Sequence, residues 1–152
     1  MTRILLLSHA PLASAMLAVA QHVFPDCAPG VIALDVDPAD TPDQVDDKLR
    51  HHLDGLFAGE PVLILVDAFG ASPCNAAVRV ADGQRVRVVA GLNVPMLWRT
   101  LCYCEESLPE LVERATAGGA QGVMPVSAPG QQHQSTAPAC PANDQVQHRH
   151  QQ

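Results

Sequence analysis

The strongest constraint on the fold is an order of residues that occurs twice along the chain. In each copy a continuous apolar run leads into a polar or acidic residue, a turn and a helix-like segment. The first copy is ILLLSHAPLASAML, where residues 4–7 precede Ser8 and His9, and the second is PVLILVDAFGASPCNAAV, where residues 61–66 precede Asp67. Unbroken apolar runs are typical of strands buried on both faces of a parallel sheet, so each copy predicts a strand followed by a helix.

The segment between the two copies continues this alternation. Residues 31–37, VIALDVD, predict a second strand that ends in acidic residues. Thr41 can cap a helix that has Pro42 at its first position. Apolar residues then recur at helical spacing as far as Phe57, and Gly59 ends the predicted helix.

The C-terminal half predicts a strand at residues 85–93, a helix at 94–103, a second helix at 108–119 and a last short strand at 121–126. We expect Gly118 and Gly119 to end the second of these helices. Pro125 lacks an amide hydrogen and therefore confines the last strand to an edge of the sheet or to a strand end.

Together these elements predict an α/β fold with a doubly wound, mostly parallel four-stranded sheet, helices on both faces and a short C-terminal edge strand. Hydrophobic residues make up 47% of the chain and aromatic residues only 3%, so the core is expected to consist of Val, Leu, Ala and Ile. A chain of 152 residues suits one domain, which we assign to residues 1–127. Residues 128–152 are rich in Gln, Pro, Ala, Ser and His and are predicted to form a disordered tail.

Composition argues against several classes of protein. The net charge of -7 provides no basic surface for a nucleic acid. The longest apolar runs are far shorter than the roughly 20 residues of a membrane-spanning helix, and the N-terminus lacks a secretory apolar region. The 5 cysteines are odd in number and irregularly spaced, which argues against a disulfide framework. We therefore expect a cytoplasmic protein that is not inserted in a membrane.

His9 and Asp67 each follow a predicted strand, and reactive groups in open parallel sheets collect at the carboxyl ends of strands. If the two strands are neighbours, the carboxylate can accept a hydrogen bond from one ring nitrogen of His9 and leave the other nitrogen as a nucleophile. The following loop contains Gly70 and Ala71, and Ser72 with the free amides of the next helix could hold a phosphoryl group. An aspartate that only caps a local turn is the alternative.

The other histidines are weaker candidates. His22 is predicted at a surface or core edge of the first helix. His51 and His52 are adjacent, so their side chains point in different directions from a helix and cannot form a metal pair. His148 and His150 lie in the tail and are interpreted as solvated.

Among the cysteines, Cys102 and Cys104 form the only pair worth testing, with packing or a surface thiol favoured over a metal site. The acidic residues Asp35 and Asp37 could suggest a phospho-aspartate receiver domain. Such a domain would also need an acidic pair after its first strand, where this chain has Ser-His instead.

Three motifs in register, ILLLSHAPLASAML, LILVDAFGASPCNAAVRVA and VVAGLNVPMLWRTL, resemble the IIA domain of the mannose-type sugar phosphotransferase system over about residues 3–127. The resemblance implies a cytoplasmic α/β homodimer that needs no metal or organic cofactor. It implies that His9 is phosphorylated at Nε2 by the histidine phosphocarrier protein and that a IIB domain or a regulatory target is the acceptor. Asp67 would orient His9 through Nδ1, Ser72 with nearby backbone amides would steady the phosphoryl group, and residues 121–126 would exchange between subunits.

The chain departs from the family pattern at two places. Ala10 and Pro11 follow the histidine where glycine is common, and Ala68 and Phe69 follow the acid where a hydroxyl or a larger aromatic residue is common. Three alternatives stay open. They are a regulatory sensor without sugar transport, the phosphotransfer subunit of dihydroxyacetone kinases, and an interaction module that is no longer phosphorylated. The motif DAFGASP favours the mannose type over the kinase subunit.

Overall fold

Four parallel strands form the centre of the molecule, in the order β2-β1-β3-β4. The computed structural model describes residues 1–56 and 59–129. The strands are β1 (Arg3–His9), β2 (Val31–Val36), β3 (Val62–Val66) and β4 (Val86–Ala90). The helices are α1 (Leu12–Val23), α2 (Pro42–Asp54), α3 (Ser72–Val80), α4 (Val94–Cys102), α5 (Leu108–Gln121) and the short 3₁₀ helix η1 (Ala28–Gly30). The predicted α/β class and parallel sheet are confirmed.

The strand order places a topological switch between β1 and β3. The chain passes from β1 to the edge strand β2 and then returns to β3 on the other side of β1. Leu7 of β1 is paired with Val66 of β3, so the two strands end side by side. The carboxyl ends of strands at such a switch form the crevice where open parallel sheets bind their ligands.

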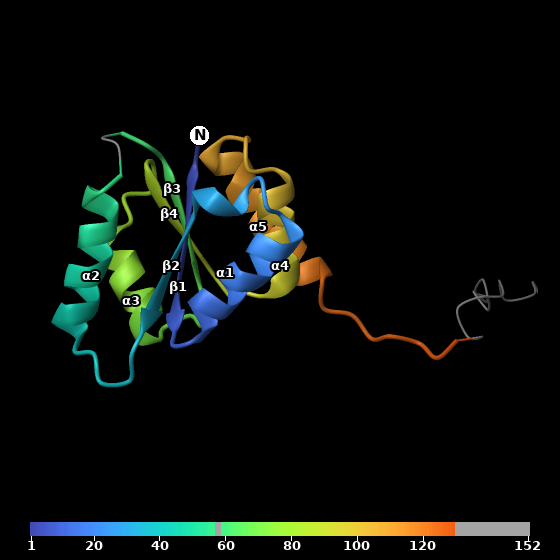
Figure 1. Cartoon of the computed structure of the whole chain (residues 1–152), viewed down its shortest axis with the longest axis horizontal. Helices are drawn as coiled ribbons and strands as arrows, with labels where there is room; N and C mark the ends of the chain where they lie inside the picture. Colours follow the sequence, from blue (N-terminus) through green and yellow to red (C-terminus); the bar gives the residue numbers. More distant parts are fainter. Residues whose placement is uncertain (57–58, 130–152) are drawn as a thin grey trace, which may run out of the picture.

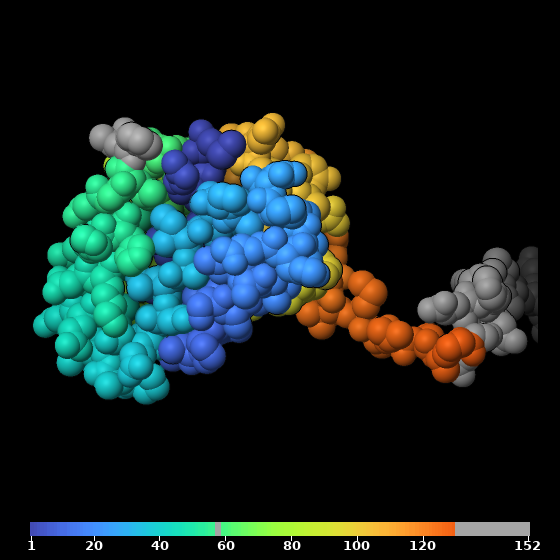
Figure 2. Space-filling view, viewed as in Figure 1, coloured from blue at the N-terminus to red at the C-terminus, as the bar shows by residue number. Residues whose placement is uncertain are grey.

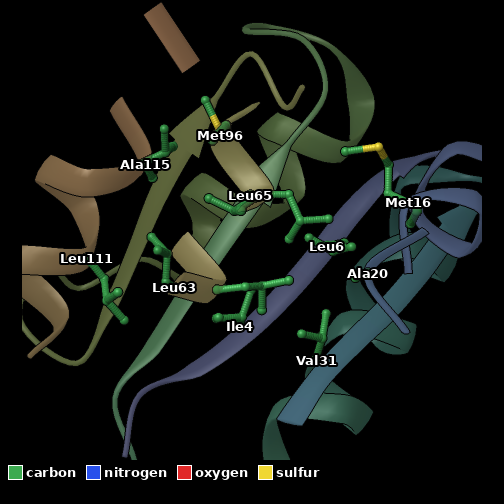
Figure 3. Packing of buried hydrophobic residues seen from close by; sticks show 14 of the residues in the cluster. Ile4, Leu6, Met16, Ala20, Val31, Leu63, Leu65, Met96, Leu111 and Ala115 are labelled. Carbon is green, nitrogen blue, oxygen red and sulfur yellow. The ribbon is translucent and has the colours of Figure 1, made fainter. Parts of the chain in front are cut away.

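Each face of the sheet is covered by helices, as Figure 1 shows. Side chains that alternate along a strand point to opposite faces. Ile4 and Leu6 of β1 therefore join the core beneath α1, α4 and α5, where Leu111 and Ala115 are fully buried (Figure 3). Leu5 and Leu7 of β1 join the second core, beneath α2 and α3. β1 and β3 are buried on both faces, which explains their unbroken apolar sequences.

The start of α2 has the predicted cap. The Thr41 side chain accepts a hydrogen bond from the Gln44 amide, and the Gln44 side chain accepts one from the Thr41 amide. Pro42 lies in the first turn, where its missing N–H has no helical acceptor to lose. The helix ends at Asp54 with Gly55 as its cap, earlier than the predicted end near Gly59.

The prediction that Gly118 and Gly119 end the last helix is wrong, because α5 continues to Gln121. Both glycines are buried against α4. A Cβ on Gly118 would lie 2.5 Å from Cβ of Arg99, and one on Gly119 would lie 2.8 Å from Cε of Met96. These glycines therefore allow α4 and α5 to approach closely.

The predicted last strand at 121–126 does not form within the single chain that the structure describes. Gln121 belongs to α5, and residues 123–128 have no regular secondary structure. This segment runs away from the folded body (Figure 2), with Val123, Met124 and Val126 exposed at 77%, 65% and 88%. Exchange of this segment between two chains stays a prediction.

Most of the tail predicted at 128–152 lies outside the described residues, together with Cys140, His148 and His150. The proposed boundary after residue 127 stays a prediction. Among the described helices, none combines the length and apolar character required to cross a bilayer.

Candidate functional site

His9 is the last residue of β1 and lies at the switch between β1 and β3. Its side chain continues the alternation of Leu5 and Leu7 and so lies on the face covered by α2 and α3. The ring is 54% exposed, which leaves it accessible to another protein. The backbone on either side is fixed, since the His9 amide bonds the Asp67 side chain and the Ala10 amide donates to the Val36 carbonyl.

Asp67 directly follows β3, and its carboxylate connects three groups. Oδ2 lies 2.7 Å from Nδ1 of His9 and accepts a hydrogen bond of 2.8 Å from the His9 amide. Oδ1 accepts a hydrogen bond of 2.8 Å from the amide of Ala68. The side chain of Asp67 is only 13% exposed, so this carboxylate is held rigidly beside the imidazole.

The hydrogen bonds of Asp67 determine its charge state. Partial burial acts to raise the pKa of Asp67, but the bonds from the His9 amide, the His9 ring and the Ala68 amide together place this pKa below its ordinary value. Asp67 is therefore a carboxylate at neutral pH and serves as an acceptor only. A neutral His9 ring in contact with it carries its proton on Nδ1, and the lone pair of Nε2 is then free.

The loop after Asp67 leads into α3. Gly70 has a φ of +79°, a conformation that L side chains rarely adopt, and a Cβ there would meet nothing within 4 Å. The turn geometry therefore explains this glycine. The Gly70 carbonyl accepts a hydrogen bond of 3.2 Å from Nδ2 of Asn75, which ties the loop to the first turns of α3.

Ser72 is the first residue of α3 and is exposed. The first-turn amides of a helix have no helical acceptor, and the positive end of the helix dipole lies there. Ala71 is the N-cap, and its amide makes a 3.4 Å hydrogen bond to the Ala68 carbonyl within the loop. Of the predicted phosphoryl-binding groups, the hydroxyl and amide of Ser72 are therefore more available than the amide of Ala71.

The residues flanking His9 show how the Ala10-Pro11 sequence is accommodated. The peptide bond between Ala10 and Pro11 is cis. Among the described residues only glycines have a positive φ, so Ala10 adopts a conformation open to any residue. On the other side of His9, Ser8 is fully buried, and its Oγ has no hydrogen-bond partner.

The remaining polar candidates have local structural explanations. His22 is exposed on α1, and Nδ1 of His52 lies 2.9 Å from the Lys48 carbonyl in its own helix. Asp35 accepts a hydrogen bond from the Ser14 amide, and Asp37 accepts one from the Ala39 amide. Within residues 1–56 and 59–129, no three His, Cys, Asp or Glu side chains are grouped closely enough to hold a metal ion.

The cysteine contact in the structure does not involve both residues of the Cys102 and Cys104 pair that the sequence singled out for testing. Sγ of Cys104 lies 2.8 Å from Sγ of Cys27, which is 77 residues away in the chain, and Cys102 is exposed. The sequence gives no indication of this contact, because it depends on packing between two distant loops.

Two features of the site were not predicted. Phe69 lies two residues after Asp67 and is 88% exposed. Asp67 also bonds the backbone amides of His9 and Ala68 as well as the imidazole. The backbone contacts of Asp67 can be seen only in a structure. The aromatic Phe69 in a polar loop could have been predicted from the sequence to lie on a contact surface.

Comparisons with known proteins agree with the geometry. The sequence profile EIIA-man, described as "PTS system fructose IIA component", matches residues 3–116. The "PTS system mannose-specific EIIAB component" of Escherichia coli K12 is 37% identical over 112 residues, covering 72% of this chain and 35% of that protein. The chain thus spans about a third of the length of this relative. The "PTS system fructose-specific EIIA component" of Bacillus subtilis is 36% identical over 73 residues, covering 47% of this chain and 50% of that protein.

Among solved structures, the mannose/sorbose specific IIA subunit from Enterococcus faecalis superimposes with a TM-score of 0.78 and 28% identity, covering 84% of this chain and 96% of that one. The phosphotransferase component EIIA from Streptococcus agalactiae shares the fold with a TM-score of 0.73 at 18% identity, covering 82% of this chain and 97% of that one.

Proposed function

Because the chain belongs to the EIIA-man family of phosphotransferase system IIA components, we propose that it accepts a phosphoryl group on Nε2 of His9 and passes it to a second protein. The proposed donor is the phosphohistidine of the histidine phosphocarrier protein, and the proposed acceptor is a IIB domain. The observation that carries the proposal is the 2.7 Å contact between Asp67 and Nδ1 of an exposed imidazole at the sheet switch.

The contact at Nδ1 supports a specific role for each ring nitrogen. With its proton on Nδ1 facing the carboxylate, His9 presents the lone pair of Nε2 to the incoming phosphorus. The bond from phosphorus to the donor nitrogen breaks as the bond to Nε2 forms, and the donor imidazole leaves with the electron pair. His9 thereby becomes a cationic phosphoimidazole, and the adjacent carboxylate stabilises that charge.

The start of α3 supplies the complement for the phosphoryl oxygens. In this proposal the hydroxyl and amide of Ser72 donate hydrogen bonds to them, with the dipole of α3 directed at the same negative charge. The φ of +79° at Gly70 and the bond from Asn75 to its carbonyl hold the loop so that Ser72 stays at the helix start. Gly70 and Ala71 are thus assigned mainly to positioning.

The proposed setting is the cytoplasm, with the protein acting as a homodimer. The exposed apolar residues Val123, Met124 and Val126 support exchange of residues 121–126 between subunits, since burial on a partner would remove them from water. The Escherichia coli relative is named as an EIIAB component, which supports a IIB domain as acceptor.

Phosphorylation from labelled phosphoenolpyruvate, with enzyme I and the phosphocarrier protein, tests the proposal. Wild-type protein and the His22→Ala variant are expected to take up label that is acid-labile and alkali-stable, while His9→Ala takes up none. His22 is the matched control because it is exposed and lies on the adjacent helix. Equal labelling of the His9→Ala and wild-type proteins would refute the assignment. In a second step, a IIB domain added to the phosphorylated wild-type protein is expected to remove its label.

A further inference from the structure

The two thiols of Cys27 and Cys104 lie together at the end of the sheet opposite the histidine. Cys27 is in the connection between α1 and β2, just before η1, and Cys104 is in the loop between α4 and α5. In Figure 1 η1 and the start of β1 are at the upper end of the sheet, whereas β1 ends at the lower edge. Since β1 has 7 residues, the two ends are separated by roughly 20 Å.

The geometry of Cys27 and Cys104 suits the formation of a disulfide bond. The sulfur atoms lie 2.8 Å apart, and each backbone is fixed locally by a hydrogen bond, from the Cys27 amide to Phe24 and from the Cys104 amide to Leu101. Little movement is needed to reach the bond length of about 2.05 Å that a disulfide requires. Both residues are half-buried rather than enclosed.

Small molecules can reach the pair from two sides. Cys27 and Cys104 line a cavity of about 190 Å³ together with Arg3 and Gly30. They also line a neighbouring depression of about 350 Å³ that includes Cys102. A peroxide is much smaller than either space.

We propose that Cys27 and Cys104 are a redox modification site, at which a hydroperoxide converts the two thiols into a reversible intramolecular disulfide. One thiol attacks the peroxide oxygen and becomes a sulfenic acid, releasing water or an alcohol. The second thiol then attacks the sulfenyl sulfur, the S–S bond forms, and water leaves. The thiols lose two electrons and the peroxide gains them, and a dithiol reductant reverses the change.

Burial, together with the neighbouring Cys27 and the charge of Glu105, raises the pKa of Cys104 to about 11. Either thiol can be the first to react, since both line the same cavity, and the product is the same disulfide.

The disulfide would connect the region after α1 to the region after α4, which cover the same face of the sheet. A bond between residues 77 apart removes much conformational freedom from the unfolded chain. The contacts of His9 lie at the other end of the sheet, so oxidation is expected to stabilise the fold and leave phosphoryl transfer unchanged. This inference does not depend on the proposed function.

Peptide mapping of the full chain after hydrogen peroxide treatment tests the bond directly. Trypsin leaves Cys102 and Cys104 in one peptide, and chymotrypsin separates them after Tyr103, so the two enzymes together identify the bonded residue. The expected product joins the peptide of Cys27 to that of Cys104 in a monomer. A bond from Cys102 or between chains, or peroxide treatment that leaves both thiols free, would overturn the proposal.

Thermal unfolding gives a second readout. Oxidation is expected to raise the Tm by about 10 °C, reversibly with a dithiol reductant. The Cys104→Ser variant should lose this shift, whereas the control Cys102→Ser should keep it, because Cys102 is exposed and does not take part in the contact. An equal shift in Cys104→Ser would contradict the assignment, and mapping of the wild-type protein decides the question if that variant does not fold.

Discussion

Replacing Asp67 with asparagine perturbs the site with the least change of shape. The carboxylate accepts hydrogen bonds on both oxygens, from the His9 amide and ring on Oδ2 and from the Ala68 amide on Oδ1. Asparagine has one acceptor oxygen and one NH₂ group. Whichever way its amide is turned, the NH₂ group faces at least one N–H donor, and the negative charge beside the imidazole is gone.

The size of the effect follows from these contacts. A hydrogen bond to a charged group contributes about 1.5–3 kcal/mol. If the bond that orients His9 is lost from the transition state, the rate of phosphoryl transfer should fall about 10- to 150-fold. The free energy of unfolding should fall by about 2 kcal/mol, because a donor of the backbone loses its acceptor.

The assay is rapid-quench transfer from the charged phosphocarrier protein, with circular dichroism and urea unfolding on the same samples. Asp37→Asn is the matched control, since the Asp37 side chain accepts a hydrogen bond from the Ala39 amide in a local turn and takes no part in the hydrogen bonds of His9. The control is expected to transfer at the wild-type rate. A folded Asp67→Asn protein with an unchanged transfer rate would refute the orienting role of the carboxylate.

Three further predictions concern stability. The pKa of Asp67 lies below its ordinary value of 3.8, so its contribution to stability is complete above that pH and is lost as the pH falls through the folded-state pKa. The free energies of unfolding of wild type and Asp67→Asn, measured in urea, should therefore converge in acid. A difference that stays constant with pH would contradict this. Gly118→Ala places a Cβ 2.5 Å from Cβ of Arg99 and should destabilise the fold by about 1–3 kcal/mol, whereas Gly30→Ala, with no atom within 4 Å, should not. Ser8→Ala removes a buried hydroxyl without a partner and should leave the free energy of unfolding unchanged or raise it by about 1 kcal/mol, and a clear loss would reveal a hidden partner.

The parts of the fold that could be predicted are those set by local pattern. The unbroken apolar runs of β1 and β3 indicate burial on both faces of the sheet, and the Thr41-Pro42 pair indicates the start of a helix. The predicted end of α2 is wrong because the cap is Gly55 rather than Gly59, and the predicted end of α5 is wrong because Gly118 and Gly119 do not act as a stop signal. In α5 the buried Gly118 instead serves helix packing, and only the position of α4 shows this.

The candidate site could also be predicted in part from the sequence. Ends of neighbouring parallel strands meet at one edge of a sheet, so His9 and Asp67 could be paired from their positions after two apolar runs. The second role of Asp67, as an acceptor for the His9 amide, depends on the exact course of the backbone. The contact of Cys104 with Cys27 depends on the relative placement of two loops, for which sequence spacing contains no signal.

The most direct test of the central claim is the identity of the phosphorylated nitrogen. Nitrogen-15 NMR of the protein labelled in its histidines, recorded before and after charging by the phosphocarrier protein, distinguishes Nε2 from Nδ1. With Nδ1 held 2.7 Å from Asp67, the phosphoryl group is expected on Nε2 of His9. A phosphoryl group on Nδ1 of His9, or on another residue, would contradict the account.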